Sequence, residues 1–325
     1  MRVTVARMLG RQLGSEQRSL PSYRSRISLK ELKNRAAELR EMLRACSLCP
    51  HECGARRLDG RYGVCRSTAN VTISSAAPHY GEEAPLTGTN GSGTIFLSSC
   101  NLKCTFCQNY DISHLRLGRP VSTGDVAEIM LRLQRSRCHN INLVTPTHFT
   151  PQIVEALVMA VDRGLSIPLV YNCGGYESVQ TLRLLMDVID IYMPDIKYSE
   201  NETARRFSGA PRYWDVVTEA VREMHNQVGD LEVDDRGIAQ RGLLIRHLVL
   251  PNRLAGSRKV LEFVSRDLSP HSYVNIMDQY RPAYRAIRYN ELGRTITARE
   301  YEEVLELASA LGLHRGFLQS NHRLN

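Results

Sequence analysis

The chain has 325 residues, of which 42% are hydrophobic and 23% are charged, so it contains enough apolar material for a large globular core. No run of 18 apolar residues occurs, which predicts that nothing spans a membrane and that no membrane partner is needed. The net charge of +8 fits a nucleic-acid partner or an anionic ligand, but it fits a protein with neither equally well, because the arginines are spread along the chain.

Residues 1–28 have the composition of a basic tail. They contain six arginines and five serines against a single acid, Glu16. This composition is typical of an organellar transit peptide, and a disordered basic tail is the simpler interpretation. We therefore expect the protein in the cytoplasm, or in an organelle matrix if this segment is a transit peptide.

Residues 29–90 are predicted to form a helix followed by a small metal-binding module. Apolar residues recur at helical spacing over 29–45, and Ser28 is the expected N-cap. The helix leads into four cysteines spaced by two, three and eleven residues: Cys46, Cys49, Cys53 and Cys65. Four thiolates complete a tetrahedral ligand set, which zinc or an iron–sulfur cluster would satisfy equally well.

Cysteine usage favours metal binding over a disulfide framework. The chain has nine cysteines, and seven of them fall between positions 46 and 107. Such clustering in a chain of this size is typical of metal sites in a reducing compartment. Cys138 and Cys173 stand apart in apolar surroundings, and we expect both to be buried structural thiols.

Residues 91–325 are predicted to form an α/β barrel that follows a turn-prone segment at 71–93. The expected strands are 94–99, 141–145, 168–172, 189–193, 243–250 and 272–277, and the expected helices lie near 123–135, 150–163, 178–187, 211–227 and 255–267. Strand–helix alternation of this kind predicts parallel βαβ units. Six units favour a partial, TIM-like (β/α)6 barrel, whose active site would lie at the carboxyl ends of the strands.

Polar side chains do gather at that end of the predicted strands. They are Thr145, Pro146, Thr147 and His148 after the second strand, Asn172 after the third, Asp195 and Lys197 after the fourth, and Arg246 and His247 in the fifth. Each has a plainer interpretation. Asp195 and Lys197 could form a surface ion pair worth at most about 1 kcal/mol, and the two histidines could be a solvated loop residue and a satisfied core residue. Only the shared location favours a binding role.

A second cysteine motif follows the first predicted strand. Cys100, Cys104 and Cys107 form a CxxxCxxC run. A [4Fe–4S] cluster normally takes four thiolates, so three cysteines leave one iron open to another ligand. An open coordination position is where metal sites usually perform chemistry.

This motif, with Phe106 before its last cysteine, resembles the signature of radical S-adenosylmethionine (SAM) enzymes. The segments 91–96, 107–110, 142–148, 195–198 and 241–251 narrow the resemblance to a family related to pyruvate formate-lyase activating enzymes, and the run at 46–54 is similar to that family's N-terminal module. The resemblance covers about residues 21–320.

The resemblance implies a function for the open iron. Cys100, Cys104 and Cys107 would hold a [4Fe–4S] cluster whose fourth iron chelates SAM, and one electron would cleave SAM to a 5′-deoxyadenosyl radical that abstracts hydrogen from a substrate. Phe106 would lie near the adenine. Relatives that activate glycyl-radical enzymes hold a cation with acidic residues after the third and fourth strands; Asn172 stands at one of these positions, which implies a weaker or absent cation site.

Implied partners are SAM, a reductant such as flavodoxin or ferredoxin, and a substrate that could be a protein. A true glycyl-radical activase is the closest alternative function. A zinc-stabilised, basic nucleic-acid-binding protein is the alternative from another class, but aromatic residues make up only 6% of the chain and no nucleic-acid-binding motif accompanies the arginines.

Overall fold

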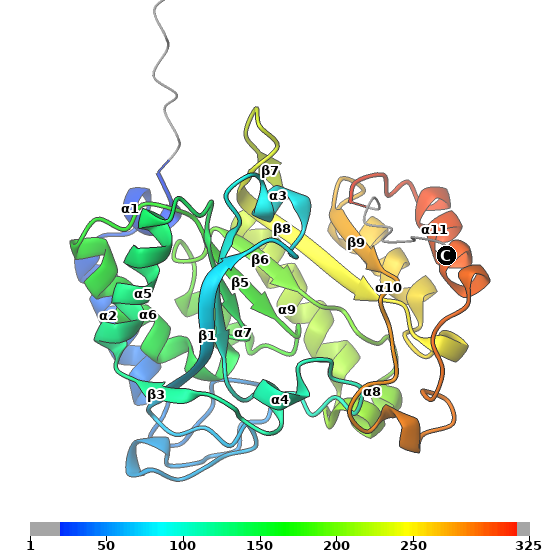
Figure 1. Ribbon diagram of the computed structural model, residues 1–325, viewed down its shortest axis with the longest axis horizontal. Helices are drawn as coiled ribbons and strands as arrows, with labels where there is room; N and C mark the ends of the chain where they lie inside the picture. Colours follow the sequence, from blue (N-terminus) through cyan, green and yellow to red (C-terminus); the bar gives the residue numbers. More distant parts are fainter. Residues whose placement is uncertain (1–19, 317–325) are drawn as a thin grey trace, which may run out of the picture.

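The computed structural model describes residues 20–316 as one mixed α/β fold (Figure 1). Its strands are β1 (Val71–His79), β2 (Ser92–Leu97), β3 (Arg119–Val121), β4 (Ile141–Val144), β5 (Leu169–Cys173), β6 (Ile191–Pro194), β7 (Glu232–Val233), β8 (Ala239–Leu248) and β9 (Tyr273–Met277). Its α-helices are α1 (Ser22–Ser25), α2 (Leu29–Glu41), α3 (Ala84–Thr87), α4 (Tyr110–Ser113), α5 (Thr123–Arg135), α6 (Thr150–Asp162), α7 (Val179–Leu184), α8 (Asn201–Ser208), α9 (Tyr213–Val228), α10 (Ser257–Phe263) and α11 (Ala298–Ala310). The shorter helical turns are η1 (Arg57–Asp59), η2 (Thr147–Phe149), η3 (Pro251–Arg253), η4 (Val264–Leu268) and η5 (Ala286–Arg288).

Six parallel strands form the framework, as the sequence predicts. They pair in the order β2-β4-β5-β6-β8-β9, and each crosses to the next in the chain through helical structure. The sheet is curved but not closed within the described residues, so the (β/α)6 partial barrel is confirmed. Helices α2, α5 and α6 stack along one side of the sheet, and α10 and α11 lie beyond β9 (Figure 1).

The segment expected to be turn-prone contains a strand instead. β1 lies antiparallel between β2 and β3 and pairs with both. Its serines, alanines and proline have weak strand propensity, but pairing on both edges decides the conformation. The sheet therefore crosses the predicted domain boundary at residue 90, because β1 pairs with β2.

The polypeptide is already ordered before residue 28. Tyr23 in α1 is only 2% exposed, and its hydroxyl donates to the carbonyl of Ile167 at 2.7 Å. The tail predicted over 1–28 thus ends earlier, because burial and this long-range bond fix the segment; residues 1–19 lie outside the described part. Ser28 caps α2 as expected, accepting from the amide of Glu31 at 3.1 Å.

A loop plugs the barrel at the amino ends of its strands. Residues 80–91, with α3, follow β1, and Leu86 packs inside the barrel against Val170, Ile191 and Leu244. These apolar side chains fill the barrel interior near the amino ends of the strands. None of the helices within residues 20–316 combines the length and apolar character that crossing a membrane requires.

Candidate active site

The three-cysteine loop leaves the carboxyl end of β2 and is held by backbone bonds. The amide of Lys103 donates to Ser208 at 2.8 Å, and the amide of Thr105 donates to Phe207 at 2.7 Å. Both acceptors lie at the end of α8, which is more than a hundred residues away in the sequence. The loop therefore has a conformation imposed by tertiary contacts.

The three thiols of this loop line one cavity of about 260 Å³ in the barrel interior. Each sulfur has a polar neighbour: the Ser208 hydroxyl donates to Cys104 Sγ at 3.0 Å, the Leu102 amide donates to Cys100 Sγ at 3.4 Å, and the Ser113 hydroxyl lies 3.2 Å from Cys107 Sγ. Donors aimed at sulfur stabilise thiolates and tune the potential of a bound cluster. The donor set therefore fits an iron–sulfur cluster with one open iron.

Burial disfavours the ionised form of two of these thiols, Cys100 and Cys104. It raises the pKa of Cys100 to about 12, with Cys104 and Cys107 adding to the effect, and it also raises the pKa of Cys104. Thiolate binding to iron would reverse this penalty, because metal ligation displaces the protons.

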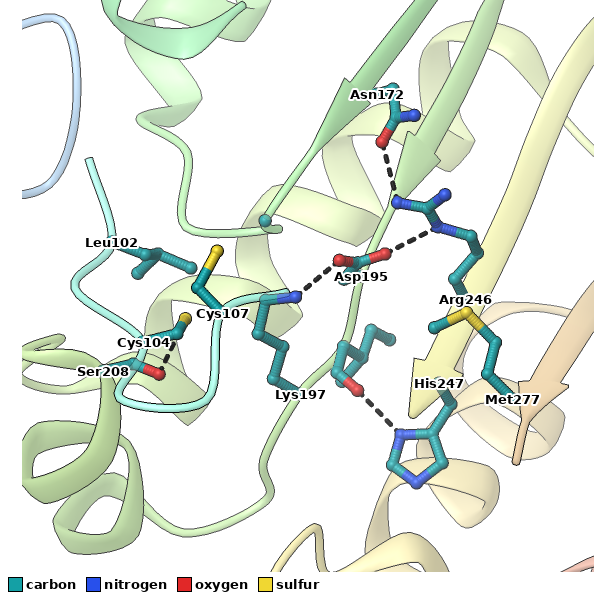
Figure 2. A network of polar contacts seen from close by, with 12 residues as sticks. Leu102, Cys104, Cys107, Asn172, Asp195, Lys197, Ser208, Arg246, His247 and Met277 are labelled. Carbon is teal, nitrogen blue, oxygen red and sulfur yellow. Dashed lines mark hydrogen bonds and ion pairs between the residues drawn. The ribbon is translucent and has the colours of Figure 1, made fainter. Parts of the chain in front are cut away.

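A network of charged side chains occupies the same cavity (Figure 2). Arg246 Nε on β8 donates to Asp195 Oδ1 at 2.7 Å, and Lys197 Nζ donates to Asp195 Oδ2 at 2.5 Å. A second guanidinium nitrogen of Arg246 donates to Asn172 Oδ1 at 2.8 Å. Burial alone would raise the pKa of Asp195, but the two cations hold it below its usual value.

Two glutamates of the loop at residues 80–91, Glu82 and Glu83, lie close to Arg246. Arg246 Nη1 is 3.9 Å from a carboxylate oxygen of Glu82 and 3.9 Å from one of Glu83. Asn275 on β9 donates to Glu83 at 2.9 Å. Three carboxylates therefore surround one guanidinium and hold its pKa above the usual range, although burial opposes this.

The predicted site residues divide into two groups. Those that line the cavity are Cys100, Cys104, Cys107, Phe106, Thr145, Asn172, Asp195, Lys197 and Arg246. Four predicted SAM-binding residues do not: Pro146, Thr147, His148 and His247. A larger cavity, about 510 Å³, lies between α10 and α11, and none of the residues predicted for the site lines it.

The two histidines make buried hydrogen bonds elsewhere, so we do not retain them as SAM contacts. His247 Nδ1 lies 2.7 Å from the carbonyl of Ile196, and Figure 2 shows its ring turned away from Asp195. His148 Nε2 lies 2.8 Å from the carbonyl of Ser98. Burial lowers the pKa of His148 to about 3 and that of His247 to about 4, so both rings are neutral.

Thr147 points to a buried acid that the sequence analysis missed. Its hydroxyl donates to Glu177 Oε1 at 2.6 Å, and the Tyr171 hydroxyl donates to Oε2 at 3.1 Å. Burial raises the pKa of Glu177 to about 7 despite these donors. Cys173, expected to be structural, is buried, lines the cavity and also contacts this carboxyl group. No local sequence signal marks Glu177.

The upstream cysteines lie close to one another, on the same side of the molecule as the cluster loop. His51, among them, has Nε2 at 2.8 Å from the carbonyl of Asn101 in the cluster loop. Among residues 20–316, no three His, Cys, Asp or Glu side chains are arranged to hold one metal ion. The second metal at Cys46, Cys49, Cys53 and Cys65 therefore stays a prediction. The absence of a site for a single ion does not bear on the three-cysteine loop, because the thiolates of an iron–sulfur cluster each bind a separate iron.

Comparisons with known proteins identify the superfamily of the chain. Residues 94–233 match the family model described as the radical SAM superfamily. An uncharacterized protein of Methanocaldococcus jannaschii, MJ0674, is 33% identical over 282 residues, which are 84% of this chain and 77% of the relative.

Solved structures share the fold only loosely. A structure of TYW1 with a lysine–pyruvate adduct has a TM-score of 0.43 at 13% identity, covering 68% of this chain and 74% of its own. Streptococcus suis SuiB bound to SAM has a TM-score of 0.46 at 12% identity and covers 67% of this chain; the match spans 47% of SuiB. SuiB bound to its precursor peptide SuiA scores 0.47.

Proposed function

Because this chain belongs to the radical SAM superfamily, we propose that it is an enzyme that holds a [4Fe–4S] cluster on Cys100, Cys104 and Cys107 and uses it to cleave SAM reductively. One observation carries the assignment: the three thiols line the same cavity as Asp195 and Lys197. When bound, the cluster and SAM supply the chemistry, in which one electron cleaves the sulfonium carbon–sulfur bond and the resulting 5′-deoxyadenosyl radical abstracts hydrogen from the substrate.

The protein's own residues would bind and orient SAM. Lys197 offers a cation for the SAM carboxylate, and Asp195 holds that cation in place. Thr145 and Asn172 line the same cavity, where their polar atoms can accept from hydroxyl or amino groups. Phe106, 5% exposed, would lie against the adenine as the family resemblance implies.

Arg246 supports the inference that no separate cation is needed. Its guanidinium lies between Asn172 and Asp195, the two positions that hold a cation in the glycyl-radical activating relatives. The fixed positive charge of Arg246 would take the place of a separate bound cation. A protein substrate is the class that the resemblance to activating enzymes favours; a radical signal on an added partner, seen by electron paramagnetic resonance, would establish it.

The proposal is tested by removing one thiol. Protein reconstituted without oxygen should bind about four irons in the 100–107 loop and form 5′-deoxyadenosine from SAM under dithionite. Cys104→Ala should lose most of this iron and the product, whereas Cys138→Ala, at a buried thiol outside the cavity, should keep both. Equal 5′-deoxyadenosine from Cys104→Ala and the parent would show that the loop is not the cluster site.

A further inference from the structure

We infer that one face of the protein, next to the cluster loop, docks an acidic protein that delivers single electrons. The inference rests on the proposed function, because only a redox centre in this loop needs such a donor. The face is built from residues 61–66, 110–119 and 281–288, which we call the arginine patch. In Figure 1, α4 lies between the loops of residues 50–70 and the η5 segment, all at the same end of the molecule.

The charge of the arginine patch is nearly all of one sign. Its three segments carry seven arginines, all exposed, and a single acid, Asp111. An exposed surface of this kind attracts an acidic partner and accelerates its association.

The arginine patch is also unusually apolar for a surface so charged. Of the eleven large hydrophobic side chains exposed within residues 20–316, six belong to it: Tyr62, Val64, Tyr110, Leu115, Leu117 and Ile287. Ile287 is 77% exposed and Tyr62 is 64% exposed. Apolar groups ringed by charge are typical of protein interfaces rather than of free surface.

Contacts join the three segments into one surface. The Arg116 guanidinium lies 6.0 Å from the Tyr62 ring centroid and donates to the carbonyl of Arg66 at 3.4 Å. The ring of Tyr284 stacks on Tyr110, with centroids 5.2 Å apart, and on His114, with centroids 4.4 Å apart. The three segments of the arginine patch are therefore in contact with one another and form one surface.

The arginine patch touches the cluster loop from outside the cavity. The Arg285 amide donates to the carbonyl of Thr105 at 2.9 Å, and a ring nitrogen of His114 lies 3.0 Å from the carbonyl of Cys104. None of its arginines or six exposed apolar side chains lines the central cavity. Of the three segments only Ile112 and Ser113 line it, and the Ser113 hydroxyl lies 3.2 Å from Cys107 Sγ. A partner bound to the exposed side chains therefore lies against the cluster loop and not inside the cavity, which favours an electron donor over a substrate that must enter it. In the transfer, the donor's redox cofactor loses one electron and the cluster gains it, with no bond made or broken.

The test compares two charge-reversal variants of equal net charge. Arg116→Glu/Arg285→Glu alters the arginine patch, and Arg132→Glu/Arg266→Glu alters exposed arginines on α5 and η4. The probe is an acidic flavodoxin. Its affinity for the holoenzyme is measured by calorimetry in the oxidised form, and the rate of cluster reduction is measured by stopped flow with the reduced form at low and high salt.

We expect the patch variant to lose about tenfold or more in both affinity and second-order rate at low salt, and to lose most of the parent's salt dependence. The control variant should match the parent, and all three proteins should be reduced equally by dithionite. A patch variant that binds and accepts electrons like the control overturns the inference, and this is the result expected if the arginine patch serves a substrate protein instead. A parent that takes up no cluster would overturn the proposed function, while the calorimetry would still decide the patch.

Discussion

The guanidinium of Arg246 donates to the amide oxygen of Asn172 at 2.8 Å, joining β8 to β5 across the intervening strand β6. The same guanidinium binds Asp195 on its other nitrogen. One side chain therefore joins β8, β5 and the end of β6 within the cavity. Its charge is matched by Asp195 and by two glutamates, so it acts as a permanent cation of the site.

Replacing Arg246 should show what its positive charge contributes to stability and to SAM binding. Arg246→Met removes the one cation that Asp195, Glu82 and Glu83 share and leaves Lys197 as the only cation bonded to Asp195, which should cost about 3–5 kcal/mol of folding stability. SAM affinity should fall, and sodium or potassium should partly restore it, whereas the parent should ignore both ions. Isothermal titration in either salt measures this. Arg241→Met, on the same strand but outside the cavity, should lose stability alone; ion-dependent SAM binding by the parent would contradict the assignment.

Removing the hydrogen bond on Cys104 should alter the cluster potential. The Ser208 hydroxyl donates to Cys104 Sγ at 3.0 Å, and a donor to sulfur stabilises the more negative, reduced cluster. Ser208→Ala should therefore shift the midpoint potential downward by tens of millivolts, where 59 mV is tenfold for one electron. Tyr198→Phe is the matched control, because it removes only the 2.8 Å contact between the Tyr198 and Ser208 hydroxyls. Redox titration of both variants decides the point, and an equal shift in the control would argue against it.

A glycine after β5 should tolerate no side chain. Gly175 has a φ of +74°, and a Cβ there would lie 2.7 Å from the carbonyl of Asp195. Gly175→Ala should cost about 2–4 kcal/mol, the sum of left-handed strain and a backbone clash, and should lower SAM affinity by displacing Asp195. Gly164→Ala has the same strain at φ +92° but meets nothing within 4 Å. It should cost only about 1–2 kcal/mol with SAM binding unchanged; thermal melting and titration compare the two.

Glu177 should make stability fall as pH rises. Its folded pKa of about 7 exceeds the ordinary pKa of 4.5 for a glutamate, so between these values the folded protein keeps a proton that the unfolded chain has lost. Ionisation of the buried group then costs stability, about 2–3 kcal/mol between pH 5 and pH 8. Glu177→Gln should lack this decline, while Glu219→Gln on the exposed face of α9 should keep it. Melting temperatures at the two pH values measure the difference, and parallel curves for parent and Glu177→Gln would refute it.

Local pattern was enough to predict the framework of this protein. The six parallel strands, the helices over 123–135 and 150–162, and the Ser28 cap follow from apolar periodicity and capping, which act over a few residues. Strand β1 was missed because its residues have weak strand propensity and become a strand only between β2 and β3.

The site was predictable only in part, for the same reason. The prediction that residues at the carboxyl ends of the strands lie together was correct for Asn172, Asp195 and Lys197, which line one cavity. It was correct because the carboxyl ends of parallel strands meet at one edge of the sheet. It could not separate them from His148 and His247, which follow β4 or lie in β8 of the same sheet but bond to backbone carbonyls elsewhere.

The sequence by itself determined the motif of three cysteines, its place after a strand and the match to the radical SAM superfamily, since these depend on the order and spacing of residues along the chain. Tertiary structure alone decided the surroundings of that motif. The Ser208 donor to Cys104, the Arg246 bridge between Asn172 and Asp195, and the carboxylates beneath it join residues that are far apart in the chain. Charge pairing and hydrogen bonding in a cavity depend on distances in space, and no spacing along the chain encodes them.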